Sequence, residues 1–177
     1  MRHRTKKITT CAIFSAIICI FTAYVAVPAP VVGNINVGDL FILCASWLLG
    51  PLYGAISGGV VACLADLISG FAIYAPATLI IKMLLAVVSY YAFATMSKIT
   101  KFKPLSLLIS STLAELIMVF GYFFYESIIY GVTTAIASIP FNMIQGTVCL
   151  TLGTIVGYIL LKSKTVQRFS SVFLHII

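Results

Sequence analysis

The stretch 39–82 reads DLFILCASWLLGPLYGAISGGVVACLADLISGFAIYAPATLIIK, three apolar runs separated by breaks at 50–54 and 70–76. The charged residues within it are Asp39, Asp66 and Lys82. Long apolar runs with few charges, interrupted by glycine and proline, are typical of consecutive helices that cross a bilayer. The stretch therefore predicts three membrane helices in succession, the first two of them short.

Composition places the whole chain in a membrane. Of its 177 residues, 62% are hydrophobic and 8% are charged, and the mean hydropathy is +1.15, far outside the range of soluble domains. The net charge of +7 could suggest nucleic acid, but the basic residues flank apolar segments and are not interleaved with aromatic side chains. We interpret them as topology signals, and we expect a lipid bilayer and no nucleic acid as partner.

Apart from one lysine, the basic residues fall into three clusters, at 2–7, 98–103 and 162–168. The positive-inside rule assigns such clusters to the cytoplasm, so an even number of spans lies between each neighbouring pair. Residues 104–161 fit two spans, and residues 8–97, which contain three breaks, fit four. We therefore predict an all-α membrane protein, a compact bundle of six transmembrane helices with both termini in the cytoplasm.

The predicted spans follow the apolar runs at 8–27, 39–49, 55–69, a fourth ending near 97, 104–125 and 140–161. One domain, 1–177, with short basic cytoplasmic tails at 1–7 and 162–177, contains them. The first span has no small-residue cleavage site before Pro28, so we interpret it as an uncleaved helix. The exterior loops are then 27–38, 70–76 and about 127–139. The first is rich in proline, glycine and asparagine, so we expect it to be irregular, either a connector or a lid over a cavity.

Polar side chains from five of the predicted helices fall in the outer half of the bundle, at about 1.5 Å of rise per residue. The inner half is essentially apolar, whereas a channel or proton relay needs polar groups through the full thickness. This distribution predicts a blind pocket that opens outward, with aromatic walls suited to a planar, uncharged heterocycle. The candidate substrate-binding residues are Asn36, Asp66, Tyr74, Lys82, Tyr122, Glu126, Asn142 and Gln145.

Each of these polar groups also has a purely structural interpretation. Lys82 and Asp66 could pair across adjacent helices, because an unpaired charge at that depth is costly. Asp39 could cap the second helix, and the two amides of the last span could join helices by hydrogen bonds. Glu115 falls near the midplane, and its role and protonation stay open.

Small side chains form a stripe along the first span, at Ala12, Ala16, Cys19 and Ala23. Such stripes let helices approach closely in lipid, so this one serves either internal packing or the docking of a partner. For two glycine pairs, 54/58 and 153/157, we favour internal packing. The five cysteines lie in apolar runs without a CxxC spacing or a nearby histidine, so we interpret them as packing residues and expect no metal and no cofactor.

Residues 34–82 resemble the substrate-binding S components of energy-coupling factor (ECF) vitamin transporters. The resemblance rests on the GD after the first loop, the LGPLYGA turn and the YAPATLIIK segment, together with SIPFNMIQG at 138–146. The size, the six helices and the cytoplasmic termini match as well, so it covers nearly the whole chain. It implies a multi-pass protein of a bacterial plasma membrane that binds one vitamin or vitamin precursor at its outer side.

The resemblance further implies docking onto a transmembrane T component that carries two cytoplasmic ATPase subunits, so that this chain is not itself an enzyme. It has no Walker motif. Ala12 and Ala16 match the AxxxA docking motif of the family, and 27–38 corresponds to its gating loop. The chain resembles most the group that handles small pyridine or pyrimidine precursors such as pyridoxine or hydroxymethylpyrimidine, followed by riboflavin and pantothenate binders.

Three other functions remain open from the residues alone. A solitary secondary transporter needs a polar path inward, which the apolar inner half does not provide. An intramembrane enzyme would draw on Glu115, Glu126 and Asp66, but no nucleophile–base pair or histidine-rich metal site accompanies them. A structural subunit would not need polar groups that converge from five helices.

Overall fold

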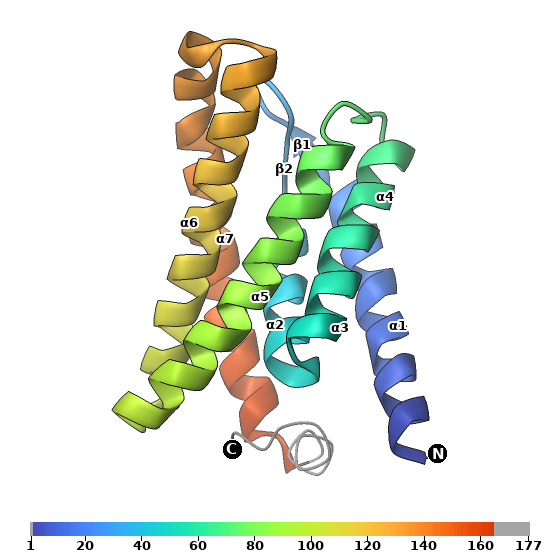
Figure 1. Ribbon diagram of the computed structural model, residues 1–177, viewed down its shortest axis with the longest axis vertical. Coiled ribbons are helices and arrows are strands. Elements are labelled where there is room, and N and C mark those ends of the chain that lie inside the picture. Colours follow the sequence, from blue (N-terminus) through green and yellow to red (C-terminus); the bar gives the residue numbers. More distant parts are fainter. Residues whose placement is uncertain (1, 165–177) are drawn as a thin grey trace.

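The computed structural model describes residues 2–164, which form a bundle of helices with one short hairpin (Figure 1). In chain order the elements are α1 (Arg2–Ala23), β1 (Ala26–Pro28), β2 (Asn34–Asn36), α2 (Gly38–Leu49), α3 (Pro51–Ala55), η1 (Ile56–Val60), α4 (Val61–Ile68), α5 (Ala75–Thr100), α6 (Lys103–Ile129) and α7 (Val132–Lys162). Most of the predicted C-terminal tail, 165–177, lies outside the described residues, as does Arg168 of the third basic cluster.

Five helical segments of the described chain are long and apolar enough to cross a bilayer. They are Thr5–Ala23 within α1, Pro51–Ile68 formed by α3, η1 and α4, and the whole of α5, α6 and α7. Within Pro51–Ile68 the helix widens locally at η1, a π-bulge. The sixth segment, α2, has 12 residues and is too short to span alone. The all-helical membrane bundle is thus confirmed, with one short helix among its six helical segments.

The prediction of an exterior loop at 127–139 is wrong for most of its length. Helix α7 begins at Val132, so only Tyr130 and Gly131 separate it from α6. Gly131 adopts a φ of +88°, a left-handed conformation in which the chain reverses without the steric cost of a side chain. Pro140 lies inside α7 instead of starting it, because proline is tolerated in membrane helices whose neighbours compensate for the lost hydrogen bond.

The first exterior loop is non-helical as predicted, but it is more regular than expected. Strands β1 and β2 pair antiparallel, with Ala26 opposite Asn36, Val27 opposite Ile35 and Pro28 opposite Asn34. Gly33, at a φ of +78°, lies in the turn between them. The pairing satisfies backbone groups that an irregular loop at a membrane surface would leave without partners.

The core forms around a short α2 that is surrounded by longer helices. Trp47 on α2 is 1% exposed and donates a hydrogen bond from Nε1 to Ser110 Oγ at 3.0 Å. Gly157 of α7 lies directly against its ring, since an added Cβ would come within 2.5 Å of it. The other predicted glycine positions also pack internally: Gly54 faces Ser46, Gly58 faces Ile42 and Gly153 faces Leu43. The predicted packing role of both glycine pairs is therefore confirmed.

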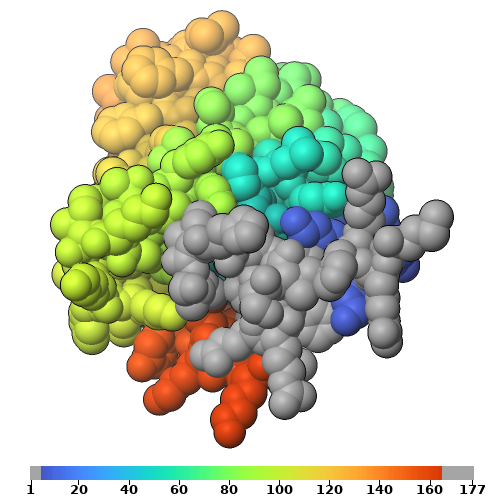
Figure 2. Space-filling view, turned by 60° about the horizontal axis from the view of Figure 1, so that its bottom comes forward, coloured from blue at the N-terminus to red at the C-terminus, as the bar shows by residue number. Residues whose placement is uncertain are grey.

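The helix ends that carry the basic clusters lie together at one end of the bundle. In Figure 1 the start of α1 and the ends of α5 and α7 are all at the bottom, and Figure 2 shows these three segments, blue, yellow-green and orange-red, on one face. The hairpin and the α4–α5 and α6–α7 connections lie at the opposite end (Figure 1). This arrangement is what an even number of passes between clusters requires, while the side of the membrane stays a prediction.

Candidate functional site

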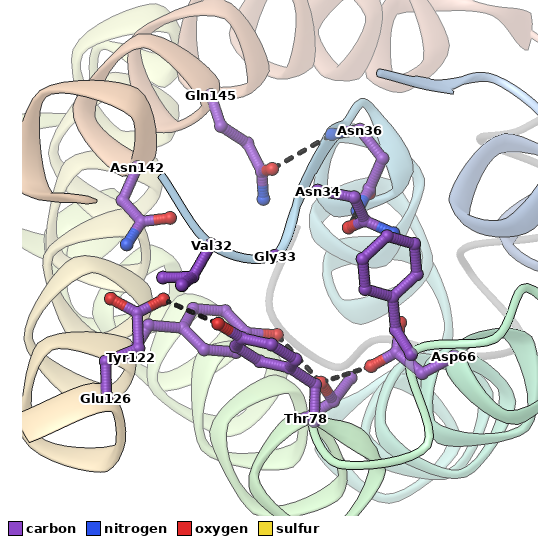
Figure 3. A pocket seen from close by; sticks show the side chains of 12 residues that line it. Val32, Gly33, Asn34, Asn36, Asp66, Thr78, Tyr122, Glu126, Asn142 and Gln145 are labelled. Atoms are coloured by element: carbon purple, nitrogen blue, oxygen red, sulfur yellow. Dashed lines mark hydrogen bonds between the residues drawn. The ribbon is translucent and has the colours of Figure 1, made fainter. Parts of the chain in front are cut away.

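A cavity opens at the hairpin end of the bundle, between the hairpin and helices α4 to α7. Its empty volume is about 370 Å³, including the mouth. Twelve residues line it: Val32, Gly33, Asn34, Asn36, Asp66, Phe71, Tyr74, Thr78, Tyr122, Glu126, Asn142 and Gln145. In Figure 3, Gln145 and Asn142 lie on one side and Thr78 on the other, and the chain at Val32 and Gly33 passes between them.

The hairpin covers the cavity by direct contact with an aromatic side chain. A Cβ placed on Gly33 would lie 3.3 Å from the Tyr74 ring, so a larger residue would push the loop away from Tyr74. Tyr74 is itself 6% exposed, and its ring centre lies 5.9–6.3 Å from those of Tyr122, Tyr125 and Tyr130. Of these four tyrosines, Tyr74 and Tyr122 line the cavity, and their tilted rings are suited to holding a flat ligand.

One carboxylate of the cavity is held by a chain of hydroxyl groups. Thr78 donates to Asp66 Oδ2 at 2.5 Å, and the Tyr122 hydroxyl lies 2.9 Å from Thr78 Oγ1. Because the Thr78 proton points to Asp66, the Tyr122 hydroxyl is the donor in the second bond. Asp66 on α4, Thr78 on α5 and Tyr122 on α6 are thereby fixed in one orientation.

The second carboxylate of the cavity is that of Glu126, one turn after Tyr122 on α6. Tyr74 donates to Glu126 Oε1 at 3.3 Å. Burial, together with the nearby Glu126 carboxylate, raises the pKa of the Tyr74 hydroxyl above its ordinary value, so Tyr74 remains a donor at any pH the cell reaches. The other Glu126 oxygen, Oε2, has no hydrogen-bond partner among the described residues.

Gln145 joins the hairpin to the floor of the cavity. Its Oε1 accepts a hydrogen bond from the backbone N–H of Asn36 at 2.9 Å, and its Nε2 donates to Asp39 Oδ2 at 2.9 Å. The same Asp39 oxygen accepts from Lys82 Nζ at 2.7 Å. An amide from α7 therefore links the hairpin to an ion pair between α2 and α5, the interhelical role that the sequence allowed for it.

Lys82 pairs with Asp39, so the alternative of a Lys82–Asp66 pair is wrong. Thr78, one turn before Lys82 on the same face of α5, occupies the Asp66 carboxylate instead. Asp39 makes no cap to α2, which begins after Val37 without a side-chain cap. The side chain that accepts from the first turn is that of Asn36, whose Oδ1 lies 3.0 Å from the Gly38 N–H.

Seven of the eight candidate substrate-binding residues line this one cavity: Asn36, Asp66, Tyr74, Tyr122, Glu126, Asn142 and Gln145. Lys82 does not line it and lies behind Gln145, 2% exposed, with Nζ 5.2 Å from the Tyr122 ring centre. Their role in binding stays a prediction. Sequence reasoning missed Thr78, although its spacing of four from both Tyr74 and Lys82 on one helix was a usable signal. It also missed Asn34, which the hairpin brings to the cavity.

The predicted docking residues are on the outside of the bundle. Ala12 and Ala16 are both exposed, whereas Ile18 and Thr22, on another face of α1, are fully or almost fully buried. The stripe is therefore not consumed by internal packing at these two positions. Within the described part of the chain, both side chains stay accessible.

The chain is similar to a transporter family, to a named transporter and to an uncharacterized protein. A family model described as "ECF-type riboflavin transporter, S component" matches residues 2–165. An "Uncharacterized protein in gap 3'region" of Pyrococcus woesei is 33% identical over 147 residues, 82% of this chain and 95% of that protein. The "Thiamine precursor transporter HmpT" of Lactococcus lactis subsp. cremoris (strain MG1363) is 32% identical over 167 residues, 92% of this chain and 89% of that protein.

A solved structure extends the similarity to the fold. It is described as "Structure and mechanism of the S component of a bacterial ECF transporter" and superposes with a TM-score of 0.65 at 23% identity. The match covers 90% of this chain and 99% of that one. The helical arrangement described above is therefore shared over nearly the full length of both chains.

Proposed function

The chain belongs to the family of ECF-type S components, and we propose that its cavity binds a single-ring pyridine or pyrimidine precursor of a vitamin for an ATP-driven importer. As a member of this family it is a multi-pass plasma-membrane subunit for substrate binding and not an enzyme.

The observation that carries the proposal is a set of unpaired polar atoms on the cavity wall. Asn34 and Asn142 each have an Nδ2 donor without a partner among the described residues, and Glu126 has an Oε2 acceptor without one. Buried polar atoms almost always have partners. A ligand that accepts two hydrogen bonds and donates one would complete all three. An aromatic ring with acceptor nitrogens and an amino or hydroxymethyl donor has this pattern.

The remaining walls suit the same chemistry. Phe71, Tyr74 and Tyr122 offer ring faces to a flat ligand. Asp66, fixed by Thr78, offers a second carboxylate to an amino substituent. Lys82 is engaged by Asp39 and shielded from the cavity, which favours an uncharged or weakly basic substrate over a carboxylate-bearing one such as pantothenate.

The name of the relative HmpT indicates which compound to test first as a ligand. HmpT is called a thiamine precursor transporter, and hydroxymethylpyrimidine is a single-ring precursor with the donor and acceptor pattern described above. Pyridoxine is the next compound in size and polarity.

Riboflavin is a second candidate because the matching family model is named for its transport. The cavity leaves about 20 Å³ of free space for a water-sized sphere, so even a single ring requires the hairpin and Tyr74 to move outward. The three fused rings and ribityl chain of riboflavin would require a larger movement.

The proposed partners are the T component and two ATPase subunits that the family implies. Exposed Ala12 and Ala16 support docking through α1, because small side chains allow a partner helix to approach closely without displacing a core residue.

Isothermal titration of the detergent-purified chain tests the substrate. We expect tight binding of hydroxymethylpyrimidine, weaker binding of pyridoxine, and none of pantothenate. Tight binding of riboflavin with no response to either single-ring compound would replace the proposal with the second candidate. A chain that binds none of the panel would refute both.

Transport assays test the energy source. Liposomes that contain this chain together with the T component and ATPases should accumulate the ligand only with internal ATP. Accumulation by the chain alone, without ATP, would instead establish the solitary secondary transporter.

A further inference from the structure

Below the cavity, four helices bring together ionisable side chains that do not line it. Asp39 on α2, Lys82 on α5, Glu115 on α6 and Cys149 on α7 are 0%, 2%, 3% and 0% exposed. One oxygen from each carboxyl group and the Cys149 Sγ all lie within 4.8 Å of one another. We call Asp39, Glu115 and Cys149 the acidic cluster. It contains Glu115, the residue whose role the sequence left open.

Hydrogen-bond donors reach only one side of the acidic cluster. Lys82 and Gln145 both donate to Asp39 Oδ2, at 2.7 Å and 2.9 Å. Asp39 Oδ1 and both oxygens of Glu115 have no hydrogen-bond partner among the described residues. A carboxylate that is buried at this depth and accepts nothing is among the costliest groups a membrane protein can contain.

The balance of charges also argues against ionisation of both carboxyl groups, Asp39 and Glu115. Lys82 is the one cation that the described residues place against the two carboxyl groups, so ionisation of both would leave a net negative charge in the interior. The remaining titratable groups nearby add no positive charge: Tyr122 on α6 donates to Thr78, and Asp66 on α4 accepts from the same threonine.

We propose that Glu115 and Asp39 form a proton-binding site in which the Glu115 carboxyl group holds one proton and directs it at Asp39 Oδ1. The proton is taken from water as the chain folds, and the site then carries no net charge together with Lys82. Asp39 Oδ1 would accept the hydrogen bond of this proton, while Asp39 Oδ2 continues to accept from Lys82 and Gln145. Since Gln145 also lines the cavity, the proton stabilises the floor on which the substrate site is built.

A metal ion fits these atoms less well than a proton. Coordination by Cys149 would need its thiolate, but the Cys149 thiol points to the carbonyl oxygen of Asn36, with Sγ 3.7 Å from it. The Lys82 ammonium, bonded to the same aspartate, would repel a second cation. A proton, unlike a metal ion, can bind here without a thiolate ligand and without additional room between the side chains.

Infrared spectroscopy of the purified, ligand-free chain tests the proposal. We expect the C=O stretching band of a protonated carboxylic acid at neutral pH, lost in Glu115→Gln. The cavity variants Asp66→Asn and Glu126→Gln are matched controls and should keep it. Glu115→Gln should melt at the wild-type temperature, because an amide replaces a neutral acid of similar shape. Its ligand affinity should stay within about twofold of the wild-type value.

Three results would overturn the proposal. The first is a wild-type spectrum without such a band, which requires no variant to fold. The second is a band that persists in a folded Glu115→Gln protein. The third is a wild-type melting temperature that rises with added sodium or divalent ions and no longer does so in Glu115→Gln, which would make the acidic cluster a cation site. These readouts do not depend on which ligand the cavity takes.

Discussion

At the scale of single residues, the ion pair between Lys82 and Asp39 shows how one contact decides the role of a buried charge. The two side chains are 2% and 1% exposed, and their charged atoms are 2.7 Å apart. The pair lies behind the cavity wall and supports Gln145, so Lys82 affects the site through structure.

Replacing Lys82 with Met should destabilise the protein by about 3–5 kcal/mol, because it leaves the Asp39 carboxylate buried without its cation. Thermal unfolding in detergent measures this. The double variant Lys82→Met/Asp39→Asn is the control and should recover much of the loss, since both charges are then removed. A Lys82→Met protein with wild-type stability and greatly reduced affinity would show instead that the lysine contacts the substrate.

Asn142 offers the matching test for a residue on the cavity wall. Replacing it with Ala should weaken ligand binding by about 1–3 kcal/mol, because the ligand then loses the proposed hydrogen bond from the Asn142 Nδ2 donor. Titration calorimetry measures the change, with the exposed Thr147→Ala on the same helix as control. Equal affinities in both variants would remove Asn142 from the site.

At the scale of helices, α7 packs its glycines against α2 so closely that side-chain volume is excluded. A Val at Gly157 would place Cβ within 2.5 Å of the Trp47 ring, which is nearly fully buried and cannot move outward. We expect a loss of about 1–3 kcal/mol in stability from this overpacking. The exposed Thr151→Val on α7 should melt like the wild type; similar melting of both variants would mean that α7 shifts freely along α2.

Helix α1 has the opposite character at Ala12 and Ala16, which face outward. Replacing Ala12 and Ala16 together with Leu should abolish ATP-driven uptake and leave ligand binding unchanged, because the added volume blocks the partner helix and touches nothing inside. Ala137→Leu, at an exposed position on α7, is the control and should transport normally. Loss of ligand binding in the α1 variant would place the stripe in internal packing.

Element boundaries could be predicted from the sequence only in part. The short α2 and the break before α5 followed from the apolar pattern, whereas α7 begins eight residues earlier than its proline suggested. Proline reports a local preference, and neighbouring helices outweigh it inside a bundle. The β1–β2 hairpin was missed as well, because strands of three residues carry too little pattern to predict.

At the scale of the whole molecule, the three basic helix ends lie together at one end, and the cavity opens at the other. Cysteines introduced at Lys101 and Val132 test which side each end faces. We expect a membrane-impermeant maleimide to label Val132→Cys in intact cells and Lys101→Cys only after permeabilisation. The wild type, whose native cysteines within the described chain lie in helices, is the control. The reverse labelling pattern would invert the topology.

The sequence by itself determined that this is a helical membrane protein and that its polar side chains gather at one end. Hydropathy, basic clusters and helix breaks are properties of consecutive residues, so they can be interpreted without the fold. Seven of the eight candidate binding residues line one cavity for the same reason, since depth along a helix follows from position.

Only the tertiary structure decided which partner each polar group has. Lys82 could reach Asp39 or Asp66 from the sequence, and the rotation of α5, with Thr78 bound to Asp66, selected Asp39. The same rotation withdraws Lys82 from the cavity and leaves Glu115 beside Asp39 without a donor. Such choices depend on directions and distances between helices far apart in the chain, which no local pattern encodes.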